Sequence, residues 1–320
     1  MLSIFYRKKR VGANSIETVF DAIGVQLLQH RIVYLPYEGT SLKAILGNIC
    51  YVRRNRNKTN HITGDAHYIA LATGSHTLLT IHDVRSAFTG NWLKCAIIKL
   101  LWFIIPVMIV KKVSVISEET RNDLLKIVPF ARNKITVIPN PYKNELLGVA
   151  KNKISGKPCI LHFGTKENKN LERVLEALRG IDCLLVIVGK MTEKQVILAK
   201  GIDYENYCDL PFSEIVNLYR KCDIVSFPST FEGFGMPVIE ANVARRPVLA
   251  GDIPVLRNVA RDSALFVNPF EVSQIKEGFE RLLNEPKLRT ELVEKGVENA
   301  RRFAPNKIAE QYNQLYRQLM

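Results

Sequence analysis

Short apolar runs alternate with amphipathic helical stretches along nearly the whole chain, and this alternation limits the possible fold more than any other feature. In the first half, the runs rich in Val, Ile and Leu are LSIFYR, RIVYLP, NHITG, HTLLTIHD, VSVIS and ITVIPN. Strands that alternate with helices are typical of βαβ units, in which a parallel sheet is covered by helices. The sequence therefore predicts an α/β fold.

A polar stretch near the middle, NELLGVAKNKISGKP, divides two such series. The second series comprises CILHFG, LLVIVG, NYCDL, IVSFPS, PVLAGD and ALFVNP, and the last fifty residues are helical by pattern. A chain of 320 residues is long enough for two ordinary domains. We expect two doubly wound domains, residues 1–150 and 151–320, with ligands bound beyond the carboxyl ends of the strands and in a cleft between the domains.

The segment FEGFGMPVIE, residues 231–240, follows one of these predicted strands directly. Its two glycines allow a tight turn and a close approach of the backbone to a ligand. Pro237 suits the first turn of a helix over residues 236–244, whose free N–H groups suit an anion or hydroxyl groups. Glu232 lies in the loop and Glu240 about one turn inside the helix. Carboxylates at these places can accept hydrogen bonds from the vicinal hydroxyls of a sugar or ribose.

EGFGMPVIE resembles the E-x7-E signature of retaining GT-B glycosyltransferases of the family-4 type, the glycosyl transferases group 1. ARRPVLAGDIPVLRNVARDSALFVNP and CILHFGTKENKNLERVLEAL are similar to other parts of that family's donor half. HITGDAHY, LLTIHDV, VSVISEETRNDL and KITVIPNP resemble its acceptor half. The resemblance spans nearly the whole chain and is most specific over residues 222–269. It implies two Rossmann-like domains that face a central cleft, with the final helices packing back toward the N-terminal domain.

The resemblance implies that the C-terminal domain holds a nucleotide-sugar donor, and we expect a GDP- or UDP-sugar. Glu240 would hold the donor ribose, and Glu232 would lie near the transferred sugar. Lys169, with Lys166 as the runner-up, would neutralise the departing diphosphate, which gains negative charge as it leaves. The remaining donor-side residues that the resemblance implies are Gly164, Gly233, Phe234, Gly235 and Met236.

In the N-terminal domain, the resemblance places His82 near the reacting sugar, where it acts in catalysis together with Glu232 and Lys169. Asp65 and His67 are expected on the acceptor side, and Gly12 in a loop that approaches a phosphate. The chain has no DxD triad, so we expect a site without a metal. No cofactor is expected either, because the nucleotide-sugar is a substrate.

Three positions depart from the family pattern. Thr165 stands where arginine is common, Arg245 where the family usually has glycine, and Asn258 where it commonly has glutamate. These departures support an alternative hypothesis, a catalytically inactive GT-B subunit that binds a glycan or a partner enzyme. A third hypothesis is a GT-B epimerase or phosphorylase. The leading hypothesis is a retaining hexosyltransferase that assembles cell-surface polysaccharide on a glycan or lipid-linked acceptor, by front-side attack.

Positive charge is concentrated in the first 150 residues, which hold 20 Lys and Arg against 9 Asp and Glu. Two clusters, RKKR and RRNRNK, supply much of it. Aromatic residues are not interleaved with these clusters as a nucleic-acid platform requires, so an anionic membrane is the more natural partner than nucleic acid. The expectation is a cytoplasmic protein that contacts the membrane peripherally, at its cytoplasmic face.

Three further features bear on the compartment. The apolar stretch from Cys95 onward contains Lys99 and Pro106, so we interpret it as a buried helix that enters a buried strand rather than as a membrane span. No secretory signal is visible at the N-terminus. The six cysteines form no CxxC pair, which favours reduced, buried thiols over a zinc site or a disulfide framework.

Overall fold

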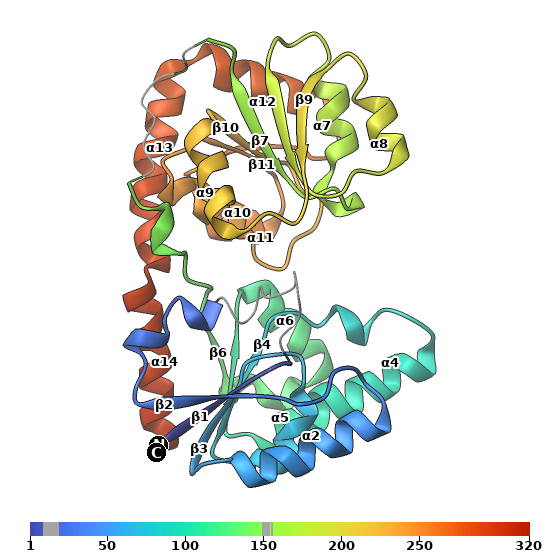
Figure 1. The fold of residues 1–320 in the computed structure, drawn as a ribbon, viewed down its shortest axis with the longest axis vertical. Coiled ribbons are helices and arrows are strands. Elements are labelled where there is room, and N and C mark those ends of the chain that lie inside the picture. Colours follow the sequence, from blue (N-terminus) through green and yellow to red (C-terminus); the bar gives the residue numbers. More distant parts are fainter. Residues whose placement is uncertain (9–18, 149–153, 155) are drawn as a thin grey trace. The chain divides into compact units, whose positions relative to one another are not determined.

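The chain folds into two compact units, each built on a six-stranded parallel sheet (Figure 1). The computed structural model describes residues 1–8, 19–148, 154 and 156–320. The N-terminal unit consists of Met1–Pro141 and Pro305–Met320, and the C-terminal unit of Tyr142–Ala304. The division of the chain thus falls between Pro141 and Tyr142, before the expected boundary at residue 150, and the last helix belongs to the N-terminal unit.

The sheet of the N-terminal unit has the strand order β2-β1-β3-β4-β5-β6. All of its pairings are parallel, and the strands are largely buried, which explains their apolar sequences. The strands are β1 (Leu2–Tyr6), β2 (His30–Tyr34), β3 (Thr59–Ile62), β4 (Thr77–Ile81), β5 (Lys112–Val115) and β6 (Ile135–Val137). The α-helices of this unit are α2 (Leu42–Asn55), α3 (Ala70–Thr73), α4 (Trp92–Ile98), α5 (Ile105–Ile109), α6 (Glu118–Ile127) and α14 (Pro305–Leu319). A π-helix, η4 (Lys99–Ile104), joins α4 to α5, and the 3₁₀ helices are η1 (Gly24–Gln26), η2 (His67–Ile69), η3 (Arg85–Ala87) and η5 (Pro129–Lys134).

The sheet of the C-terminal unit has the order β12-β11-β10-β7-β8-β9, again with parallel pairings. Its strands are β7 (Cys159–Phe163), β8 (Leu184–Val188), β9 (Asp203–Tyr207), β10 (Ile224–Phe227), β11 (Val248–Gly251) and β12 (Leu265–Val267). Its α-helices are α7 (Leu171–Ala177), α8 (Glu193–Leu198), α9 (Phe212–Lys221), α10 (Met236–Val243), α11 (Pro254–Ala260), α12 (Val272–Asn284) and α13 (Pro286–Ala300). The 3₁₀ helices are η6 (Asn144–Leu146), η7 (Glu167–Lys169) and η8 (Arg301–Phe303).

The helix α14 completes the core of the N-terminal unit, although it comes last in the sequence (Figure 1). Its apolar face packs with β1 in a buried cluster that includes Tyr312 and Tyr316. The Tyr316 hydroxyl hydrogen-bonds Nδ1 of the buried His61 at 2.8 Å, and Nε2 of that imidazole lies 2.7 Å from the Thr80 hydroxyl. This polar chain is buried and continues from Thr80 to the Ser114 hydroxyl at 2.6 Å, so it specifies how α14 docks on the sheet.

The expectation of a buried helix after Cys95 is wrong. Trp92–Ile109 is a continuous helix of mean hydropathy 2.0, but only 17% of it is buried within the protein. Three of its side chains, Phe103, Pro106 and Val107, are buried, while much of the remainder lies at the surface. Among the residues that the structure describes, it is the one helix that is long and apolar enough to cross a membrane, by length and composition only.

The expectation of buried thiols holds for only half of the cysteines. All six are free, but Cys50 and Cys208 are exposed and Cys95 is partly exposed. Cys159, Cys183 and Cys222 are buried, and burial raises the pKa of the Cys222 thiol to about 12. Cys50 lies on the solvent side of α2 and Cys208 directly after β9, where an apolar neighbour in the sequence does not ensure burial.

Candidate active site

In the C-terminal unit, side-chain hydrogen bonds join the loops that follow the neighbouring strands β7 and β10. The Asn170 side chain donates hydrogen bonds to the carbonyls of Pro228, at 3.0 Å, and Pro269, at 2.6 Å. The Asn168 side chain donates to the carbonyl of Phe231 at 2.9 Å. Sequence reasoning assigned no role to either asparagine. The signal for Asn170 is its place just before an apolar helical stretch, where asparagine is typical of an N-cap; here it adopts φ 66° and bridges the loops instead.

These hydrogen-bonded loops bring Lys169, after β7, beside Glu232, after β10. Lys169 Nζ lies 2.6 Å from Glu232 Oε1, and the two side chains are only 23% and 10% exposed. The ammonium group also lies 4.9 Å from the centre of the Phe227 ring. Lys166, the runner-up, is exposed on the same loop. The structure thus distinguishes the two lysines: only Lys169 is held in a fixed, partly enclosed place beside the predicted sugar-binding carboxylate.

A glycine at position 164 makes this arrangement possible. Gly164 follows β7 with φ +90°, which side chains rarely allow, and a Cβ there would lie 2.6 Å from Cγ of Lys169. Gly235 has the same function before α10. Its φ is +108°, and a Cβ would lie 2.6 Å from Cδ2 of Leu256. Both glycines therefore keep a loop in a conformation that leaves room for a neighbouring side chain.

The helix α10 begins at Met236 with Pro237 in its first turn, as the sequence predicted. Phe234 is buried, and its ring meets the Phe303 ring edge-on at 6.0 Å. Gly233 and Glu232, which precede it, are partly exposed. Phe234 therefore anchors the loop that leads into the first turn of α10, where the positive end of the helix dipole suits phosphate or sugar oxygens.

Glu240 lies one turn inside α10 and is partly exposed. Its Oε2 accepts a 3.0 Å hydrogen bond from the hydroxyl of Tyr219, a fully buried residue of α9 that stacks on Phe163. Enclosure raises the pKa of Glu240, whereas the Tyr219 hydroxyl and the nearby Lys143 favour its carboxylate form. Sequence reasoning missed Tyr219, because only the fold brings α9 beside α10.

The three residues that depart from the family pattern, Thr165, Arg245 and Asn258, have different surroundings in the structure. The Thr165 hydroxyl donates to the carbonyl of Lys190 at 2.6 Å and so connects the loops after β7 and β8. Arg245 adopts φ 55° just after α10, the left-handed place where a helix end favours glycine. Asn258 is exposed on α11. Arg245 therefore strains a helix end, but it does not interrupt the helix that carries Glu240.

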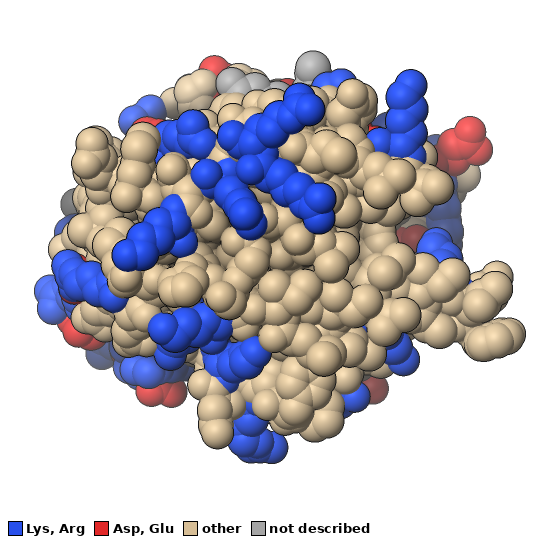
Figure 2. All heavy atoms as spheres, turned by 90° about the horizontal axis from the view of Figure 1, so that it is seen from below, with Lys and Arg blue, Asp and Glu red and all other residues tan. Residues whose placement is uncertain are grey.

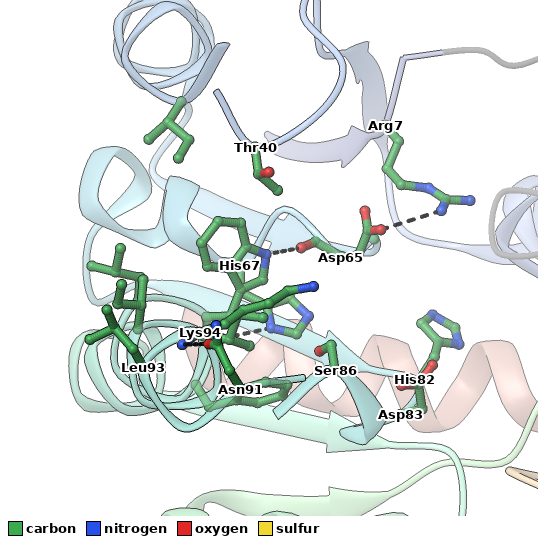
Figure 3. A pocket seen from close by; sticks show the side chains of 17 residues that line it. Arg7, Thr40, Asp65, His67, His82, Asp83, Ser86, Asn91, Leu93 and Lys94 are labelled. Carbon is green, nitrogen blue, oxygen red and sulfur yellow. Dashed lines mark hydrogen bonds and ion pairs between the residues drawn. The ribbon is translucent and has the colours of Figure 1, made fainter. Parts of the chain in front are cut away.

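The N-terminal unit has its own pocket, with a volume of about 850 Å³, shown in Figure 3. One part of its lining is polar and the other part is apolar. The polar part comprises Arg7, Asp65, His67, His82 and Asp83, and the apolar part includes Leu93, Ile97, Ile98, Leu101 and Trp102. The predicted residues His82, Asp65 and His67 thus line one pocket. Gly12 lies outside the residues that the structure describes.

Hydrogen bonds fix the two imidazoles of this pocket. Nε2 of His82 lies 3.0 Å from the carbonyl of Thr63, and Nδ1 of His67 lies 2.7 Å from the carbonyl of Trp102. Enclosure lowers the pKa of His82 to about 4, so its ring is neutral near pH 7. A carbonyl only accepts, so Nε2 of His82 carries the proton and Nδ1 remains an acceptor for a hydroxyl group.

The carboxylate of Asp65 lies 3.7 Å from Arg7, and its backbone carbonyl accepts a 2.7 Å hydrogen bond from the Trp102 indole. Asp65 is thereby connected to the apolar wall of the pocket through its own backbone. Among the described residues, no group of three or more His, Cys, Asp or Glu is placed to hold a metal ion. That the site works without a metal ion stays a prediction.

The part of the chain that carries this geometry is similar to known proteins. A family model described as "Glycosyl transferases group 1" matches residues 149–299, which include the whole β7 to α10 arrangement. The match covers slightly less than half of the chain, and it shows that this segment is similar to the family. The chain is 22% identical over 219 residues to O-antigen chain mannosyltransferase B of Escherichia coli, a match that covers 61% of this chain and 57% of that protein. The chain spans about half the length of the curated relatives it matches.

Solved structures extend the likeness to both units. Anabaena Alr3699/HepE, solved in complex with UDP and glucose, has a TM-score of 0.76 at 14% identity and covers 98% of each chain. WaaG, a glycosyltransferase involved in lipopolysaccharide biosynthesis, has a TM-score of 0.71 at 14% identity and covers 99% of each chain. At this level of identity the likeness concerns the fold. The expected GT-B fold class, with two Rossmann-like units, is confirmed.

Proposed function

We propose that the chain is a retaining, metal-independent glycosyltransferase, which moves a hexosyl group from a nucleotide-sugar to a glycan or lipid-linked acceptor in polysaccharide assembly. The observation that carries this proposal is the Lys169–Glu232 pair beside the start of α10, with Glu240 one turn further along the helix. A cation, a helix N-terminus and two carboxylates are the groups that a sugar joined to a nucleoside diphosphate requires.

On the donor side, each group has a distinct task. Glu240, oriented by the Tyr219 hydroxyl, accepts hydrogen bonds from the ribose hydroxyls. The N–H groups at the start of α10 and the ammonium of Lys169 meet the diphosphate, whose negative charge grows as the bond to the sugar breaks. Glu232 keeps Lys169 in place and accepts hydrogen bonds from hydroxyls of the transferred sugar.

On the acceptor side, the neutral His82 accepts a hydrogen bond through Nδ1 from a sugar hydroxyl and so steadies the developing oxocarbenium charge. We propose front-side attack: the acceptor oxygen bonds to the anomeric carbon as the sugar–phosphate bond breaks on the same face. The acceptor proton passes to the departing phosphate oxygen. This course gives retention without a covalent enzyme intermediate.

The relatives support the choice of acceptor class. One relative is named for transfer of mannose to an O-antigen chain, and one structural neighbour for lipopolysaccharide biosynthesis. Another neighbour was solved with UDP and glucose. The excess of basic residues in the first 150 positions supports contact with an anionic membrane that presents a lipid-linked acceptor, at its cytoplasmic face.

Donor binding tests the proposal directly. Ligand-observed NMR with UDP-, GDP-, ADP- and dTDP-sugars is expected to show one nucleotide class bound by the wild type, equally with and without chelator. Glu240→Gln should lose most of that binding. Glu298→Gln, a surface carboxylate of α13 that pairs with Arg301, is the matched control and should bind normally.

Two other results would contradict the proposal. A folded wild type that binds none of the four sugars supports a non-catalytic subunit instead. Release of an epimer or a sugar phosphate from the donor without an acceptor supports an epimerase or a phosphorylase.

A further inference from the structure

The helix Trp92–Ile109 is strongly apolar, with Lys94 and Lys99 as its charged side chains, yet it is not a core helix. A helix of this composition is ordinarily buried in a protein or in a membrane. Here only 17% of an 18-residue window of mean hydropathy 2.0 is buried within the protein. The remaining apolar surface belongs to a single continuous helix, so it is a feature of the fold rather than a scatter of isolated side chains.

The faces of this helix have different surroundings. One row, Leu93, Ile97 and Leu101, repeats every four residues and lines the pocket shown in Figure 3. Phe103 and Val107 are buried in the core of the N-terminal unit.

A third set of side chains is exposed and lies outside the pocket lining. Trp92, Leu100 and Met108 are 80%, 47% and 62% exposed. They recur every eight residues along the helix, and the pocket lining includes none of them. We call these three residues the outward row.

The charge around the helix selects one kind of partner. Residues 84–117 contain five Lys or Arg and no Asp or Glu: Arg85, Lys94, Lys99, Lys111 and Lys112. Figure 2 shows the lower side of Figure 1, where α2 and α5 lie, with Lys and Arg gathered on it and Asp and Glu mainly near its edge. Apolar side chains among cations, with a tryptophan at one end of the helix, match the boundary between anionic headgroups and acyl chains.

We propose that the helix Trp92–Ile109 lies along the surface of an anionic bilayer, with the outward row among the upper acyl chains. The helix does not span, because Phe103 and Val107 hold it in the protein core. Its other face forms the apolar wall of the pocket, so a lipid-linked acceptor reaches His82 along a helix that the lipid itself contacts. This proposal adds an apolar anchor to the electrostatic contact proposed above, and it does not depend on catalysis.

Sedimentation of the full chain with vesicles tests the anchor. Vesicles of phosphatidylglycerol and phosphatidylcholine should bind the wild type, and its tryptophan emission should shift to the blue. The triple variant Trp92→Ser/Leu100→Ser/Met108→Ser should lower the partition constant on the order of a hundredfold, because three apolar side chains no longer leave water. The matched control Val196→Ser/Ile197→Ser removes exposed apolar side chains from α8 and should bind like the wild type.

Vesicle binding at high salt distinguishes an apolar anchor from purely electrostatic binding. At about 1 M salt, where charges are screened beyond roughly 3 Å, substantial binding of the wild type should remain. Complete loss of binding at that salt concentration, or wild-type binding by the triple variant, overturns the proposal. Resistance to alkaline extraction indicates a span and also overturns it, as does concentration-dependent dimerisation through the outward row without vesicle binding. Unchanged thermal unfolding and unchanged donor binding by the triple variant show that it is folded. They also show that a loss of vesicle binding is independent of the proposed transferase function.

Discussion

Replacing Lys169 by methionine keeps much of the side chain's length and removes its charge. In the structure, the ammonium group lies 2.6 Å from Glu232 Oε1, and the Lys169 side chain is 23% exposed. Without Lys169, the Glu232 carboxylate loses its partner and repels an incoming diphosphate. The change therefore removes one attraction and adds one repulsion at the same place.

The size of the effect follows from the partial burial. Two unit charges about 4 Å apart attract by about 4 kcal/mol at an effective dielectric constant of 20. Desolvation and residual exposure reduce this to the 1.5–3 kcal/mol or so that is typical of a hydrogen bond to a charged group. Because each 1.4 kcal/mol is about tenfold, Lys169→Met should weaken nucleoside diphosphate binding by roughly 10- to 150-fold.

Isothermal titration calorimetry with the nucleoside diphosphate of the preferred donor measures this loss. Lys166→Met removes an equal charge from an exposed position and should change the affinity less than about threefold, in the range of surface charges. The double variant Lys169→Met/Glu232→Gln should recover part of the affinity, because it also removes the repulsion. If Lys166→Met costs as much as Lys169→Met, the reasoning from burial and pairing is wrong.

Three further predictions concern the fold around the site. Arg245→Gly should raise the free energy of unfolding by about 0.5–1 kcal/mol in urea titrations, since glycine adopts the observed φ of 55° without strain; a loss of stability would contradict this. Gly235→Ala should destabilise by about 1–3 kcal/mol and weaken donor binding, because its Cβ meets Leu256 at 2.6 Å and its φ is +108°; unchanged binding would show that the turn tolerates a side chain. Burial lowers the pKa of His61 to about 3, so its neutral form stabilises the fold fully above about pH 6.5, and this contribution is lost as the pH falls toward 3. His61→Asn should therefore flatten the decline in unfolding free energy between pH 6.5 and 4, and an unchanged slope would assign that decline to other groups.

Much of the architecture could be predicted from the sequence because parallel strands leave a strong pattern. All twelve apolar runs coincide with or overlap the observed strands, and the only clear displacement is β9, where Asp203–Tyr207 pairs ahead of the expected NYCDL. Buried parallel strands are mostly apolar, which makes them recognisable in the sequence, although β3 is buried with the polar residues Thr59, Asn60 and His61. The edge strand β9 is more polar and is placed by pairing with β8, which the sequence does not reveal.

Local chemistry also predicted the loop and the helix start that carry Glu232 and Glu240. Glycine, proline and two glutamates at fixed spacing describe a loop and a helix start, and the structure brings Glu232 beside Lys169. The preference for Lys169 over Lys166 could not be derived from the residues alone, since both lie in one short polar stretch. Their burial depends on the neighbouring β10 loop, and so do the roles of Asn168 and Asn170.

The sequence by itself determined the parallel α/β class, the two series of strands and the E-x7-E helix start, because these features depend on short-range periodicity and backbone stereochemistry. Only the tertiary structure decided that α14 completes the N-terminal unit, that Tyr219 holds Glu240, and that Trp92–Ile109 is largely exposed. Each of these depends on contacts between segments far apart in the chain. An apolar composition indicates that burying a helix is favourable, but only the tertiary packing decides whether the protein itself buries that helix.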